Sequence, residues 1–172
     1  QALGLLLALG ILMDHAGDRF FRLSSAAAAL MTTAGLGLLA RRFGLAAGQA
    51  PGGDGYPAVL ALTLASLLLT VVYNRAWAFD WQGRRPLLFS ALAAGLASVA
   101  LAAPASGRAL VVANDLTSIA LLGGTAGAMI LGHYYLMVLD LPIRALRSLT
   151  VLLAVGLALR TMVVAFALLG PV

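Results

Sequence analysis

Residues 114–141 of the chain, NDLTSIALLGGTAGAMILGHYYLMVLDL, decide the fold class. They form an apolar run of about 28 residues without a charged side chain between Asp115 and Asp140, and a helix needs only about 20 apolar residues to cross a bilayer. We therefore expect a membrane-spanning helix here, and the rest of the chain has to be interpreted in a lipid environment.

The composition of the whole chain agrees with a membrane-embedded protein. Of its 172 residues, 62% are hydrophobic and 10% are charged, and the mean hydropathy is +1.02, which is outside the range of soluble domains. The formal charge of +5 comes from arginine alone, and the arginines are scattered at segment ends, so no nucleic-acid partner is expected. The absence of Cys excludes disulfides and thiolate metal sites.

Six apolar segments predict an all-α polytopic transmembrane bundle that forms one integral membrane domain, residues 1–172. The segments are residues 2–13, 23–40, 57–79, 86–103, 114–139 and 148–169. The first is too short to span the membrane, so we expect it to be the inner end of a truncated helix. The polar loop of residues 41–56 shows no sign of a second domain, and no motif recurs that would indicate an internal repeat.

The arginines predict the orientation of the bundle. Seven lie in the connections after the first, third and fifth segments, and three lie after the second and fourth. Because arginine-rich loops stay on the cytoplasmic side, we expect the odd-numbered connections in the cytoplasm and both chain ends outside. The bias towards arginine, alanine and leucine is typical of bacteria, so the expected location is a bacterial inner membrane.

Three small residues and a histidine mark a candidate binding surface on the central run. Gly124, Ala128 and Gly132 recur every fourth residue, which places them in one shallow groove along the helix. His133 follows directly and is the side chain of this helix that can change charge near neutral pH. Such a groove is also typical of close helix packing, and an intramembrane His is often only hydrogen-bonded, so a packing role and a ligand or proton role both stay open.

His15 supplies the second half of a candidate haem site. It ends the first segment, and the expected topology brings it to the same membrane face as His133. Two histidines from different helices can act as the axial ligands of a b-type haem, with the small-residue groove admitting the flat macrocycle. Arginines at the membrane surface would meet the propionates: Arg19, Arg22 or Arg75. A metal site that adds Asp14 and Asp18 lacks a compact ligand spacing.

Tyr134 and Tyr135 follow His133 near the inner interface. Belt aromatics are the simplest explanation for both, but a hydroxyl beside His133 could also hold a quinone carbonyl or relay a proton. No nucleophile motif accompanies the histidine. A non-catalytic membrane subunit is therefore favoured over an enzyme, and an enzyme acting on lipid or isoprenoid substrates is the least favoured function.

Arg160 is the second anomaly of the sequence. It lies about 12 residues into the last segment, where insertion scales assign arginine a penalty of roughly 2.5 to 3.5 kcal/mol. No acidic residue is expected at its depth, because Asp115 and Asp140 fall at the two ends of the 114–139 span. Helix-terminal carbonyls, a water-filled cavity, an anionic cofactor or lipid headgroup reached by snorkelling, or a partner's carboxylate would each offset the charge. This mismatch favours a partner or a ligand.

These features predict a small subunit of a larger bacterial inner-membrane complex, of the energy-converting or electron-transport kind. It would pack against other membrane subunits and lipids, and hold haem b or a quinone near His133. The alternative is a small proton- or anion-coupled transporter or channel whose path is lined by His133 and Arg160. The short loops and the small-residue faces favour the subunit, and the scarcity of acidic residues within the spans opposes the transporter.

Overall fold

The structure, a computed structural model, describes residues 1–12, 17–42, 56–79, 81–103, 108–137 and 143–169. Within these ranges the regular structure is helical and contains no strand, which confirms the expected all-α class. The helices are α1 (Ala2–Leu12), α2 (Asp18–Arg42), α3 (Tyr56–Ala78), α4 (Arg84–Ala102), α5 (Arg108–Met137) and α6 (Ile143–Leu169). His15 and Asp14 lie outside the described residues.

Five of the described helices, α2 to α6, are long and apolar enough to cross a membrane, and α1 is shorter. The chain is therefore a multi-pass membrane protein. At 1.5 Å per residue, α5 is about 45 Å long and α6 about 40 Å, which exceeds the hydrocarbon thickness of about 30 Å. The ends of these two helices must therefore reach into the headgroup layer, or the helices must tilt.

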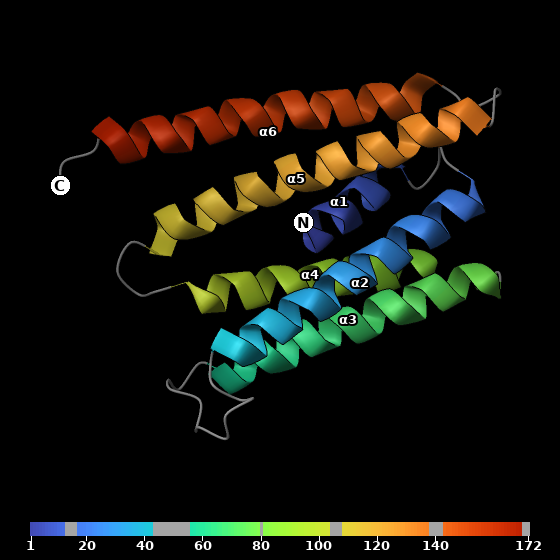
Figure 1. The fold of residues 1–172 in the computed structure, drawn as a ribbon, viewed down its shortest axis with the longest axis horizontal. Coiled ribbons are helices and arrows are strands. Elements are labelled where there is room, and N and C mark those ends of the chain that lie inside the picture. The colour runs from blue at the N-terminus through green and yellow to red at the C-terminus, as the bar shows by residue number, and fades with distance from the viewer. Residues whose placement is uncertain (13–16, 43–55, 80, 104–107, 138–142, 170–172) are drawn as a thin grey trace.

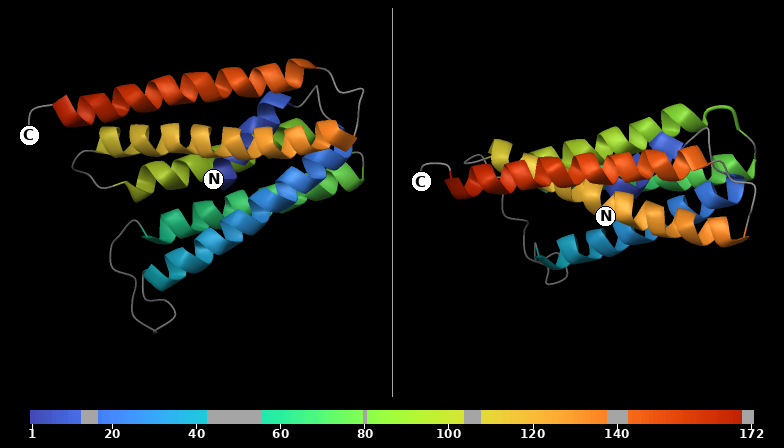
Figure 2. Two further views of the ribbon diagram at one scale, coloured as in Figure 1. Left: turned by 45° about the horizontal axis from the view of Figure 1, so that its top comes forward. Right: turned by 90° about the horizontal axis from the view of Figure 1, so that it is seen from above.

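Consecutive helices run in opposite directions (Figures 1 and 2). The last residues of α1, α3 and α5 lie at one end of the bundle, and those of α2, α4 and α6 lie at the other. This alternation agrees with the separation of arginine-rich and arginine-poor connections. Which end faces the cytoplasm stays a prediction from the arginine count.

The core of the bundle lies around α1. Helix α1 packs between a layer of α5 and α6 and a layer of α2, α3 and α4 (Figure 1). Its leucines at positions 5, 6, 9 and 12 are at most 1% exposed. The short first helix is therefore the most deeply buried of the six described helices, although it does not span the membrane by itself.

Helices α1 and α5 approach each other through glycines. A Cβ atom on Gly4 would lie 2.6 Å from Gly123 Cα and would overlap the carbonyl oxygen of Ile119. One turn further along, a Cβ atom on Gly127 would lie 3.0 Å from Ala8 Cβ. Small residues spaced four apart on both helices therefore let the two backbones touch.

The observed starts of α2, α5 and α6 differ from the expected spans. Helix α2 begins at Asp18, before the expected residue 23, and α6 begins at Ile143, before the expected residue 148. Helix α5 begins at Arg108, so Asn114 lies inside the helix and does not cap it. The reason is that the apolar residues 109–113 continue the helix without a Gly or Pro to stop it.

Candidate functional site

His133 lies on the outer surface of the bundle, four residues before the end of α5 at Met137. Its exposed side chain lines a groove of about 400 Å³ between α2 and α5. The other lining residues are apolar or aromatic: Phe20, Leu23, Met129, Ile130 and Tyr134. At 1.5 Å per residue, His133 is about 6 Å from the end of its helix. A membrane-dissolved molecule can therefore reach the imidazole from the lipid side.

The wall of this groove is aromatic. The ring centroids of Phe20 and Tyr134 are 6.2 Å apart, with planes tilted by 55°. The Tyr134 hydroxyl lies against the start of α2, where a Cβ atom on Gly17 would be only 3.1 Å from it. Across the described residues, no hydrogen bond to another side chain or to the backbone engages the Tyr134 hydroxyl or the His133 imidazole. Both groups are available to a ligand in the groove.

A second aromatic cluster fixes the position of Phe20. Phe21 stacks on Trp77 with ring centroids 4.5 Å apart and parallel planes, and it meets Phe20 edge-on at 5.6 Å. The Arg84 guanidinium lies 4.3 Å from the Trp77 ring centroid, a cation–π contact. Asn74 adds two hydrogen bonds from α3 to α2. The start of α2 is therefore held by α3, whose Trp77 is in turn contacted by Arg84 of α4, and this makes the groove a preformed feature.

The three small residues expected beside His133 have different surroundings. Gly124 packs against α6, where a Cβ atom would lie 3.0 Å from Leu153 Cδ2. Ala128 is partly buried against the core. Gly132 has no atom of a neighbouring segment within 4 Å of an added Cβ. The stripe therefore serves helix packing at Gly124 and is open beside His133.

The expected pairing of His15 with His133 stays a prediction, because His15 falls outside the described residues. Asp18 is exposed in the first turn of α2. In the part of the chain that the structure describes, no group of three or more His, Cys, Asp or Glu side chains is placed to hold a metal ion.

Arg160 is hydrogen-bonded to α5 in the other half of the bundle. Its Nη1 donates to the carbonyl oxygen of Asn114 at 2.7 Å and to Ser118 Oγ at 2.6 Å. The hydroxyls of Ser118 and Thr117 donate to the same Asn114 carbonyl at 2.7 and 3.0 Å. This carbonyl belongs to a residue six positions after the start of α5, so it is not one of the helix-terminal carbonyls that were expected to offset the charge. No acidic side chain of the described ranges forms a salt bridge with Arg160.

His133 and Arg160 are not brought together. Ser118, which bonds Arg160, lies about 22 Å from His133 along the axis of α5, at 1.5 Å per residue. The groove at His133 lies between α5 and α2, whereas Arg160 lies between α5 and α6. A path lined by both residues would have to pass most of the way across the bilayer and change sides of α5.

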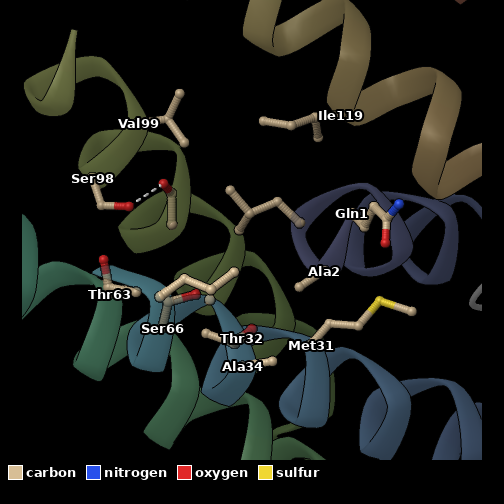
Figure 3. A pocket seen from close by; sticks show the side chains of 14 residues that line it. Gln1, Ala2, Met31, Thr32, Ala34, Thr63, Ser66, Ser98, Val99 and Ile119 are labelled. Carbon is tan, nitrogen blue, oxygen red and sulfur yellow. Dashed lines mark hydrogen bonds between the residues drawn. The ribbon is translucent and has the colours of Figure 1, made fainter. Parts of the chain in front are cut away.

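Sequence reasoning did not identify a cavity of about 500 Å³ at the N-terminal end of α1 (Figure 3). The cavity is lined by residues from α1, α2, α3, α4 and α5. It therefore depends on tertiary packing, which the spacing of apolar residues along the sequence cannot show. Four hydroxyls line the cavity, and each donates to a backbone carbonyl: Thr32 to Ala28, Thr63 to Val59, Ser66 to Ala91 and Ser98 to Gly95. Their remaining capacity is as hydrogen-bond acceptors.

No protein family, curated protein or solved structure matches the chain. A functional assignment must therefore come from the geometry of these sites. The groove at His133 has the strongest claim, since it combines lipid access, an aromatic wall and two side chains with free hydrogen-bonding capacity.

Proposed function

We propose that the protein is a small subunit of an energy-converting complex in a bacterial inner membrane, and that the groove at His133 binds the ring of a quinone. The observation that supports this is the chemistry of the groove: an imidazole and a phenol lie in an otherwise apolar wall that opens to lipid. A quinone offers a flat apolar ring and two carbonyl acceptors, and it diffuses within the bilayer.

The two polar side chains have complementary roles in this proposal. The Tyr134 hydroxyl donates to one carbonyl, and an N–H of His133 donates to the other. Phe20 packs against the ring and keeps water from it. Because an imidazole can act as a general acid or base, His133 is also suited to exchange a proton with a reduced quinone. The chain binds and orients the quinone, while a redox centre of a partner subunit supplies the electrons.

The test measures bound quinone directly. Wild-type protein, His133→Leu and Leu23→Trp are purified in mild detergent, and extracted quinone is quantified by mass spectrometry per mole of protein. Leu23 is 62% exposed in the groove, so a Trp there would fill part of the space that the quinone ring needs. We expect each variant to bind quinone about tenfold more weakly, which corresponds to the loss of about 1.4 kcal/mol.

Thr125→Val is the matched control. Thr125 is also exposed on α5, but its hydroxyl bonds to Leu121 O within the same helix and lies outside the groove. This variant should retain quinone as the wild type does. Wild-type protein without quinone, or equal amounts in all four proteins, would contradict the proposal. A reduced-minus-oxidised spectrum with a b-type band that His133→Leu removes would make haem b the occupant instead.

A further inference from the structure

The charge of Arg160 is only partly satisfied by the chain. A guanidinium carries five N–H donors, and the two on Nη1 bond to Asn114 and Ser118. The three on Nη2 and Nε have no acceptor among the residues that the structure describes. The neighbouring Asp115 carboxylate accepts a long 3.5 Å bond from Asn114 Nδ2 and forms no salt bridge with Arg160. A partly buried cation thus keeps three donors and an unpaired charge.

A groove between α5 and α6 begins at Asn114, the residue whose carbonyl accepts the Arg160 bond. Helices α5 and α6 diverge towards the start of α5 and the end of α6 (Figure 1). Between them lies a groove of about 270 Å³, lined by Leu110, Val111 and Asn114 from α5 and by Val163, Val164 and Ala167 from α6. Its inner end is Asn114, the residue that accepts the Arg160 bond. Its outer end faces the region of the lipid headgroups.

We propose that this groove holds one anionic phospholipid whose phosphate pairs with Arg160. A phosphate offers oxygens to Nη2 and Nε in the bidentate geometry that guanidinium prefers. The apolar side chains of the walls fit the start of an acyl chain. Asn114 is about 9 Å from the first residue of α5 at 1.5 Å per residue, a depth that a bent arginine side chain and a locally thinned bilayer can reach.

The lining of the groove favours a lipid. It is apolar apart from Asn114, which suits part of an acyl chain next to a charged headgroup. The net charge distinguishes between lipids. Phosphatidylglycerol carries one negative charge, whereas the ammonium group of phosphatidylethanolamine would lie near the guanidinium and be repelled. The site therefore prefers phosphatidylglycerol.

The experiment measures this preference by native mass spectrometry. Protein stripped of lipid is incubated with equal amounts of dioleoyl phosphatidylglycerol and dioleoyl phosphatidylethanolamine, and bound lipid is counted. We expect the wild type to favour phosphatidylglycerol about tenfold, and Arg160→Gln to lose this preference. Arg147→Gln is the control, since Arg147 is exposed near the start of α6 and far from the groove.

A second variant separates binding from folding. Val164 is 41% exposed in the groove, and Val164→Phe should displace the lipid while leaving Arg160 in place. The proposal is overturned if the wild type shows no preference, if Arg160→Gln keeps it, or if Val164→Phe binds phosphatidylglycerol as the wild type does. A copurifying protein that Arg160→Gln releases, with no lipid bound, would overturn it in favour of a partner's carboxylate. Quinone at His133 should be unaffected by all three variants.

Discussion

The contact between α1 and α5 gives the sharpest stability prediction, for Gly123→Ala. The added methyl group would overlap the Cα and carbonyl carbon of Gly4. These are backbone atoms, so no side-chain rotation can relieve the clash. Seen from the other helix, a Cβ atom on Gly4 would lie 2.6 Å from Gly123 Cα. Carbon atoms in contact lie about 3.5 to 4.0 Å apart, so α1 must move away by more than about 1 Å.

The size of the effect follows from two opposing terms. Overpacking of this kind costs about 1 to 3 kcal/mol, while replacing a helical Gly by Ala gains about 0.5 to 1 kcal/mol in helix propensity. Gly132→Ala provides the control, because it gains the same propensity on the same helix and meets no neighbouring atom within 4 Å. The difference in unfolding free energy between the two variants is therefore the overpacking cost alone, about 1 to 3 kcal/mol.

The assay is thermal unfolding in detergent, followed by the fluorescence of Trp77 and Trp81. For a chain of this length, about 1 kcal/mol corresponds to roughly 2 to 4 °C in Tm, so Gly123→Ala should melt about 2 to 12 °C below Gly132→Ala. Gly127→Ala should fall between them, since its Cβ would meet Ala8 Cβ at 3.0 Å, a milder overlap that a shift of a few tenths of an ångström between the helices relieves. If Gly123→Ala melts at or above Gly132→Ala, the close crossing of α1 and α5 is wrong.

Two further predictions concern buried hydroxyls. Ser24→Ala and Ser25→Ala should have different effects on the free energy of unfolding, although both side chains are 0% exposed. Ser24 Oγ has no hydrogen-bond partner in the described ranges, so its removal should leave the free energy of unfolding unchanged or raise it by up to about 1 kcal/mol. Ser25 Oγ accepts a hydrogen bond from Asn74, so its removal should lower the free energy of unfolding by about 1 to 2 kcal/mol. Equal melting temperatures would refute this. Ser66→Ala should lower the free energy of unfolding by about 0.6 kcal/mol, because the 2.8 Å bond from Ser66 Oγ to Ala91 O joins α3 to α4. The control is Thr161→Val, since the Thr161 hydroxyl bonds within its own helix. A loss of stability in calorimetry no larger than that of the control would refute the prediction.

The helices themselves were predictable because length and apolar composition determine which segments can enter a membrane. The choice of neighbour was not predictable, and α5 shows why. It carries two stripes of small residues offset by one position: the stripe of Gly124 and Ala128, and the stripe of Gly123 and Gly127. Adjacent stripes lie about 100° apart around a helix, so either can face a partner. The structure places α1 against the second stripe and α6 against Gly124.

The surroundings of His133 and Arg160 could not be predicted from the sequence either. Asn114 was expected at the start of the 114–139 span, with residues 108–113 as either a short surface helix or an earlier start of the same helix. The earlier start of α5 places it inside the bundle, where α6 runs antiparallel and brings Arg160 beside its carbonyl. Phe20 was expected in a polar connection, yet α2 begins at Asp18 and turns this ring into the wall of the His133 groove. In both cases a shift of one or two helical turns decides which side chains meet.

The separation of these two sites determines how the protein can work. His133 lies between α5 and α2 near the end of α5, whereas Arg160 contacts α5 from α6 about 22 Å away along the axis of α5, and α1 buries its leucines between the layers. A transporter needs a continuous polar path, whereas the midsection of α5 presents Gly123 and Gly127 to the backbone and side chains of α1. Two separate sites, each open to lipid at its own membrane surface, fit a subunit that receives membrane-dissolved molecules from the bilayer. We therefore favour binding and orientation, at His133 for a quinone and at Arg160 for a lipid, over conduction through the bundle.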